Sequence, residues 1–128
     1  MDTTKSVPKS GEGSGLWLIK ILTGLLLIII LAVHFTVNHM LGSMAGLMTY
    51  EEVVIYYAKN LIIPLMEILF VIFVVSHALL GLRSILLDMH PTRKTLNVIN
   101  WLFTIVGIVS IVYGIWLVIV IVQRGLSI

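Results

Sequence analysis

The sequence predicts an all-α integral membrane protein, a bundle of three transmembrane helices. Of its 128 residues 59% are hydrophobic and only 11% are charged, with a mean hydropathy of +1.13. That composition leaves too little polar surface to cover a soluble globule of this size. Three apolar runs, at 16–40, 61–87 and 98–122, each exceed the roughly 20 helical residues that cross a hydrocarbon core.

The first fifteen residues, MDTTKSVPKSGEGSG, are polar and have no periodic apolar face. We expect a flexible N-terminal tail over 1–15 and a single transmembrane domain over 16–128. A signal peptide is not expected, because the following apolar run is too long for its hydrophobic region and no small-residue cleavage site follows.

Basic residues predict the orientation. With three crossings, the N-terminus and the second connection share one side of the membrane. That side carries most of the basic residues: Lys5, Lys9, Lys20, Arg83, Arg93 and Lys94, against Lys59 and Arg124 on the other. The positive-inside rule places the N-terminus inside and the C-terminus outside. These side chains form no patch, so a nucleic-acid partner is not expected.

The helices are expected at about 16–40, 50–89 and 97–124. Thr49 and Glu52 form a capping-box pattern that starts the second helix before the bilayer, and Pro64 should kink that helix. Tyr56 and Tyr57 would then lie at the interface. The sequence HPTRK at 90–94 breaks the chain before the third helix. Close-packing points there are Gly107, Ser110 and Gly114.

One polar stripe marks the end of the second apolar run. His77, Gly81, Ser84 and Asp88 fall at i, i+4, i+7 and i+11, so that the last three lie within about 40° of His77 on one helix face. Ionisable side chains are costly in a bilayer and usually face a bundle interior or a cofactor, so the stripe is a candidate functional site. Glu67, with no basic partner near it in the same helix, should be neutral or hydrogen-bonded to a neighbouring helix.

The first crossing carries His34 and His39. Five residues turn an α-helix by about 140°, so one face cannot present both to the same ligand. His34 lies deeper and shares a face with Lys20, Thr23 and Asn38. Taken alone, His34 is equally well explained as an interhelical hydrogen-bond partner and as a ligand of a cofactor. His39 lies nearer the outer border and suits an interfacial position.

Depth separates the two deep histidines. By helix rise, His34 lies about 27 Å from the inner end of its helix and His77 roughly 10 to 15 Å from the inner end of an antiparallel one. They cannot bind one metal. The sequence contains no cysteine, which excludes thiolate and iron-sulfur sites built from this chain alone. Two single histidines at two depths suit two haems b stacked across the membrane, each completed by a ligand from elsewhere. Gly81 would allow a macrocycle to approach the backbone.

The pattern H-x3-G-x-R-x4-D, present as His77, Gly81, Arg83 and Asp88, resembles the haem-binding helix of the membrane anchor subunits of succinate dehydrogenase and fumarate reductase, respiratory complex II. The first crossing is similar too, matching the W-x2-[QKR]-x2-TG opening and the H-x3-NH ending of archaeal and bacterial members. The residues that carry this second match are Trp17, Lys20, Thr23, Gly24, His34, Asn38 and His39.

The resemblance implies a haem b-binding anchor of the hydrophobic, D-like kind. His77 would be a haem ligand, and His34 the first-helix ligand of di-haem members, so that one or two haems are shared with a partner. Arg83 would pair with a haem propionate, or else contact lipid phosphate or mark topology. Asp88, Lys20 and Thr23 are quinone-site candidates, although Asp88 also suits a solvated ion pair. Met89 stands where the family often has a quinone-binding tyrosine.

The implied partners are a second three-helix anchor subunit, an iron-sulfur subunit, a flavoprotein subunit and membrane lipid, with quinone as the substrate. The chain would be a non-flavin subunit, not catalytic alone, in the plasma membrane of a bacterium or archaeon. Two alternatives remain open: a fumarate reductase anchor, and a cofactor-free structural or transport bundle.

Overall fold

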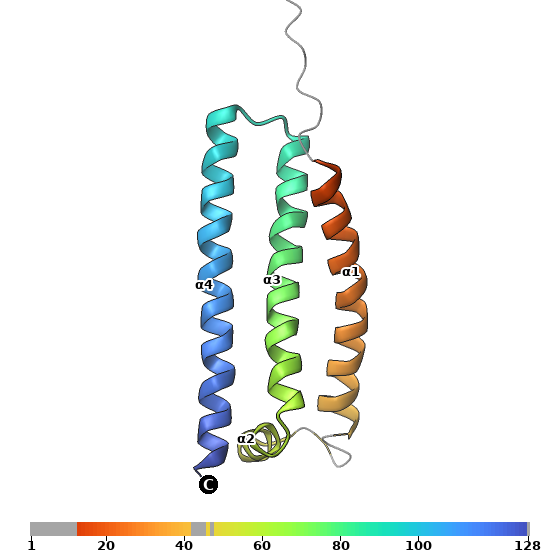
Figure 1. The fold of residues 1–128 in the computed structure, drawn as a ribbon, viewed down its shortest axis with the longest axis vertical. Coiled ribbons are helices and arrows are strands. Elements are labelled where there is room, and N and C mark those ends of the chain that lie inside the picture. Colours follow the sequence, from red (N-terminus) through yellow and green to blue (C-terminus); the bar gives the residue numbers. More distant parts are fainter. Residues whose placement is uncertain (1–12, 42–45, 47, 128) are drawn as a thin grey trace, which may run out of the picture.

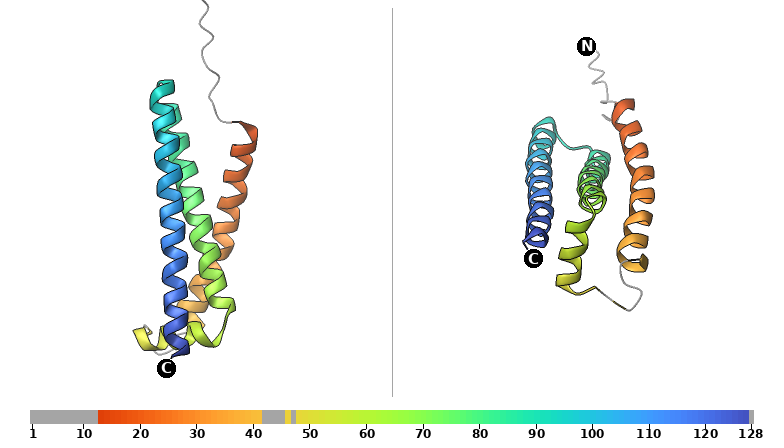
Figure 2. Two further views of the ribbon diagram at one scale, coloured as in Figure 1. Left: turned by 60° about the vertical axis from the view of Figure 1, so that its left-hand side comes forward. Right: turned by 60° about the horizontal axis from the view of Figure 1, so that its bottom comes forward.

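The computed structural model describes residues 13–41, 46 and 48–127, and residues 1–12 of the expected tail over 1–15 lie outside them. Three long helices lie side by side in a row with α3 in the middle (Figures 1 and 2). They are α1 (Ser14–Phe35), α3 (Ile62–Asp88) and α4 (Arg93–Leu126). Each is long and apolar enough to cross a membrane. The described chain is helical with no strand, which confirms the predicted fold class.

Each end of the row holds the chain segments that the topology prediction places together. The start of α1 and the α3–α4 connection lie at one end, and the C-terminus lies at the other (Figure 1). The chain reverses at His90, which has a positive φ of 52°, directly before Pro91. The α4 helix then begins at Arg93, one turn earlier than expected, because the Thr92 hydroxyl accepts a hydrogen bond from the Thr95 backbone N–H (3.3 Å).

The expected single helix over 50–89 is two helices in the structure. The short helix α2 (Tyr50–Lys59) ends before α3 begins, and α2 lies across the end of the row (Figure 1). The break falls at Asn60, which is extended (φ −139°, ψ 96°). Pro64 explains this position, because its ring would clash with the carbonyl of Asn60 in a continuous helix. Placed in the first turn of α3, Pro64 forfeits no helical hydrogen bond.

The predicted capping box at the start of α2 is confirmed. The Glu52 carboxylate accepts a hydrogen bond from the Thr49 backbone N–H (2.7 Å), and the Thr49 hydroxyl accepts one from the Glu52 N–H (3.4 Å). The hydrogen bond from the Thr49 backbone N–H, and after it the one that the Thr49 hydroxyl donates to the same carboxylate (3.0 Å), lower the pKa of the exposed Glu52 carboxyl below its ordinary value.

Glycines let the helices approach closely. Two of the expected close-packing points are confirmed, because a Cβ on Gly107 would lie 3.0 Å from Leu79 and one on Gly114 would lie 2.7 Å from Val71. At Gly125 a Cβ would lie only 2.3 Å from the Val54 carbonyl oxygen. The α2–α4 crossing therefore requires glycine at this position.

Little of the described surface is buried inside the chain. Val54, Ile63 and Val118 are its buried aliphatic residues, while most large apolar side chains of the three spans are exposed. Two polar residues are buried nonetheless: Thr23 is 9% exposed and Glu67 is 8% exposed. Buried polar groups require hydrogen-bond partners, and the partners of these two residues define the candidate sites.

Candidate functional site

The first polar cluster lies nearer the end of the row that holds the start of α1, which we call the inner end, and is named the inner cluster. It joins α1 to the polar stripe of α3. His77 Nδ1 lies 3.1 Å from the Thr23 hydroxyl. The His77 ring lies against Gly24, where an added Cβ would be 3.0 Å from its Cε1 atom. One turn toward the inner end, the Lys20 ammonium donates a hydrogen bond to the Ser84 hydroxyl (2.5 Å). The structure thus brings together four of the residues that sequence analysis selected.

Two other stripe residues have different surroundings. Gly81 faces open space, because an added Cβ would meet no atom within 4 Å. Asp88 is exposed at the C-terminal end of α3. Among the described residues, the ion pair that is present joins His34 to Glu67. Asp88 is therefore not ion-paired with Arg83 or Arg93 there. Asp88 therefore does not join the inner cluster inside this chain.

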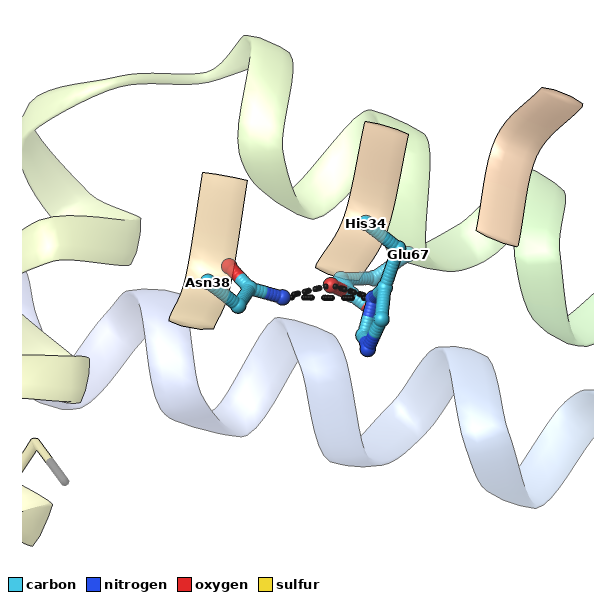
Figure 3. Close-up of polar contacts among 3 residues, drawn as sticks. All are labelled: His34, Asn38 and Glu67. Atoms are coloured by element: carbon cyan, nitrogen blue, oxygen red, sulfur yellow. Dashed lines mark hydrogen bonds and ion pairs between the residues drawn. The ribbon is translucent and has the colours of Figure 1, made fainter. Parts of the chain in front are cut away.

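The outer cluster joins α1 to the start of α3 (Figure 3). The Glu67 carboxylate lies 2.7 Å from His34 Nδ1 and accepts a hydrogen bond from the Asn38 amide (2.8 Å). The expectation that Glu67 bonds to a neighbouring helix is confirmed. His34 stacks on Phe70, with ring centroids 5.1 Å apart. Figure 3 shows its second ring nitrogen pointing away from Glu67 and Asn38.

His39 lies closer to His34 than the sequence analysis allowed. The last turn of the first crossing, Thr36–Leu41, is a π-helix, in which residues five apart are hydrogen-bonded and nearly superposed. The two imidazole centroids are therefore 6.4 Å apart. Both residues line one pocket of about 380 Å³ together with Tyr56 and Tyr57. The ideal α-helix that the separation of His34 and His39 assumed is therefore not found here, and both rings face one pocket.

Tyr57 brings α2 into the outer cluster. Burial, the charge of the Glu67 carboxylate and a hydrogen bond to it raise the pKa of the Tyr57 phenol well above its ordinary value. The phenol therefore stays protonated and can act as a hydrogen-bond donor. The short helix α2 thus forms one wall of a polar site.

Arg83 faces α4 rather than the His77 cluster. Its Nε–H donates a hydrogen bond to the side-chain oxygen of Asn100 (2.8 Å), and both residues line a pocket with Thr104. The sequence analysis missed Asn100 and Thr104. A signal was available, because Asn97, Asn100 and Thr104 recur at i, i+3 and i+7 in an otherwise apolar run and so share one helix face.

The two histidine clusters lie at different depths. Both contact α3, the outer one at Glu67 and the inner one at His77. Those positions are ten residues apart in one helix, which corresponds to about 15 Å of rise. This spacing agrees with the separation expected from sequence and is too large for a single metal ion.

These features define an integral membrane protein of three spans, whose polar sites lie between otherwise apolar helices. Residues 3–111 match the family of succinate dehydrogenase/fumarate reductase transmembrane subunits. A curated relative from Archaeoglobus fulgidus, the succinate dehydrogenase hydrophobic membrane anchor subunit, is 34% identical over 104 residues, covering 79% of this chain and 84% of the relative. The chain belongs to this family of membrane anchor subunits. Comparison with solved structures gave no match.

Proposed function

We propose that this chain is the haem b-binding membrane anchor of a succinate:quinone oxidoreductase in the plasma membrane. It would hold the flavoprotein and iron-sulfur subunits at the bilayer together with a second anchor subunit. Family membership supports the anchoring role. The exposed apolar faces of all three spans are consistent with a further membrane subunit packing beside them. The chain holds no flavin chemistry of its own and would not be catalytic alone.

The observation that carries the haem proposal is the hydrogen bond between His77 and Thr23. The Thr23 hydroxyl also lies 2.8 Å from the Ile19 carbonyl and 3.1 Å from the Lys20 carbonyl. A hydroxyl has one proton and two acceptor lone pairs, and on a helix it usually donates back to a preceding carbonyl. We therefore assign the Thr23 oxygen as the acceptor of the His77 Nδ1–H.

This assignment leaves the His77 Nε2 lone pair free. A neutral imidazole with its other nitrogen held by a hydrogen bond is the form that binds iron. Gly81, one turn away, leaves the space that a macrocycle needs. The residues present thus fit an axial haem site. A bound haem b supplies one-electron transfer, while this chain orients the ligand and provides an apolar wall.

His34 supports a second haem by the same argument. Its Nδ1–H donates to Glu67, which directs the second nitrogen away from the cluster (Figure 3). A carboxylate bonded to the distal nitrogen of a histidine is a common partner of metal-binding imidazoles. The haem count would then be two, each completed by a residue of the partner anchor.

Quinone is proposed to react near the inner end of the row. Lys20 and Thr23 lie there beside His77 and Ser84, and a lysine can donate a hydrogen bond to a quinone carbonyl. Asp88 is exposed at the same end, where a partner subunit could complete the site. The same architecture serves fumarate reduction, and the family description covers both directions; quinone potential decides between them.

A reduced-minus-oxidised absorption spectrum of the complete complex tests the haem proposal. His77→Ala should abolish one b-type signal, and His34→Ala should remove the other while the inner haem remains bound. His90→Ala, at the exposed turn, is the matched control and should leave both signals. An unchanged spectrum in His77→Ala would exclude it as a ligand, and a cofactor-free bundle would show no b-type bands in any variant. If His39→Ala rather than His34→Ala removes the outer haem, the outer ligand is His39.

A further inference from the structure

A second polar pocket opens between α3 and α4, near the inner end of the row and separate from both histidine clusters. It has a volume of about 460 Å³. Its polar lining consists of Ser76 and Arg83 from α3 with Asn100 and Thr104 from α4. The remaining wall is apolar, formed by Leu16, Leu79, Leu80 and Phe103.

The pocket contains a fixed positive charge. An arginine guanidinium carries a positive charge, and the hydrogen bond to Asn100 holds the Arg83 guanidinium in place. The Arg83 Nη1 atom is buried and has no hydrogen-bond partner. Among the residues that the structure describes, no carboxylate lies within ion-pair distance of this guanidinium, since the ion pair found there involves His34 and Glu67.

A half-buried guanidinium with one buried and unpartnered Nη1 atom favours a counter-charge. An ionised group removed from water is costly unless it is paired, and a neutral acceptor such as a quinone carbonyl would not neutralise it. The guanidinium fork matches the geometry of phosphate and carboxylate oxygens. The pocket is therefore suited to an anionic ligand.

The depth of the pocket identifies the source of that anion. Arg83 lies five residues before the end of α3, which corresponds to about 7.5 Å. The helix is 27 residues long, or about 40 Å, against a hydrocarbon core of about 30 Å. Arg83 therefore lies close to the level at which lipid headgroups meet acyl chains.

We propose that the Arg83–Asn100 pocket binds the phosphodiester of an anionic phospholipid, whose acyl chain lies along the apolar wall. Arg83 pairs with the phosphate, Asn100 positions the guanidinium, and the Ser76 and Thr104 side chains line the path between headgroup and chain. The lipid thereby fills the groove between α3 and α4 and stabilises the way the two helices pack. This inference does not depend on the haem proposal.

A haem propionate is a less suitable partner for Arg83. Six residues separate it from His77, and six residues turn an α-helix by about 600°, so the two side chains leave α3 about 120° apart. The contacts agree with this difference, since His77 bonds to Thr23 on α1 whereas Arg83 bonds to Asn100 on α4.

The experiment measures lipid binding to the complete detergent-purified complex by native mass spectrometry, after the bound lipid has been washed out. The probes are phosphatidylglycerol, diacylglycerol with the same acyl chains, and inorganic phosphate. The phosphatidylglycerol affinity should fall at least tenfold in Arg83→Gln and by less in Arg83→Lys, which keeps the charge but not the fork. Arg93→Gln, at an exposed position of the same inner end, is the matched control and should bind like the unmodified complex.

Each alternative has its own outcome. Equal binding of phosphatidylglycerol to Arg83→Gln and to the unmodified complex would overturn the proposal, as would equal binding of diacylglycerol. Inorganic phosphate that binds as tightly as the lipid would make the site one for free phosphate and overturn the lipid assignment. Loss of a b-type haem signal in Arg83→Gln would identify a propionate partner instead. If Arg83→Gln loses the second anchor subunit but keeps its affinity for phosphatidylglycerol, the partner of Arg83 is a carboxylate of that subunit, and the proposal is overturned.

Discussion

The Glu67 carboxylate lies 2.7 Å from His34 Nδ1, and the residue that carries it is only 8% exposed. This contact connects the first span to the start of the second one. A carboxylate so placed satisfies the His34 Nδ1–H and the Asn38 amide together. The outer polar cluster therefore depends on one acceptor, and its stability can be tested at that residue.

Glu67→Ala should lower the free energy of unfolding by about 2–3 kcal/mol, because it removes the carboxylate that accepts hydrogen bonds from the partly buried His34 and Asn38 side chains. The measurement is the thermal midpoint of the purified complex in detergent. Glu67→Gln keeps one oxygen acceptor and should lose clearly less stability. Equal losses in the two variants would show that the acceptor role of Glu67 is not the origin of the effect.

Thr23→Val should weaken haem binding at the proposed inner site while the fold is retained. Valine has nearly the shape of threonine but cannot accept the His77 Nδ1–H, so the orientation and tautomer of the ring are no longer fixed. Loss of the hydrogen-bond partner of a metal-binding histidine costs about 10-fold to 100-fold in metal affinity, and haem retention during dilution of the complex is the measurement that checks it. Thr23→Ser restores the hydroxyl and should restore retention; a Thr23→Val complex with full retention contradicts the tautomer assignment.

Gly125→Ala should separate α2 from α4. The new Cβ would lie 2.3 Å from the Val54 carbonyl oxygen and 2.5 Å from the Ala58 Cβ, and a backbone atom cannot move without its helix. Strain of this kind costs about 1–3 kcal/mol, visible as a lower thermal midpoint. The control is Gly15→Ala in α1, where an added Cβ meets nothing within 4 Å. Alanine in an open helical position should leave stability unchanged or raise it.

The capping box should make the stability of α2 depend on pH. The pKa of Glu52 in the folded chain is lowered from its ordinary value of 4.5. The stabilisation is therefore complete above about pH 4.5 and is lost as the pH falls through the lower folded-state value. The thermal midpoints of the unmodified protein and of Glu52→Gln should differ at pH 6 and converge in this acid range. A difference that does not depend on pH would assign the effect to packing instead.

Much of the site could be predicted from residue spacing. His77, Thr23, Lys20 and Ser84 follow from polar residues at helical intervals in apolar runs, and the structure brings them together at the α1–α3 contact. For Glu67 the sequence predicted a hydrogen bond to a neighbouring helix but not the residue that forms it. A buried carboxylate requires a partner, but its position in the sequence does not identify that partner. Asn100 was missed because its role depends on which face of α4 meets Arg83.

The sequence by itself determined the membrane class, the three spans, the pairing of their ends and the capping box of α2, because hydropathy and helix capping are local properties of the chain. The tertiary structure decided what local patterns do not contain. Pro64 divides one expected helix into two, and the π-turn at Thr36–Leu41 rotates His39 toward His34. Arg83 turns from the histidine face to Asn100. Each of these outcomes depends on the facing direction of a side chain, which is set by the packing of neighbouring helices and by departures from ideal helix geometry.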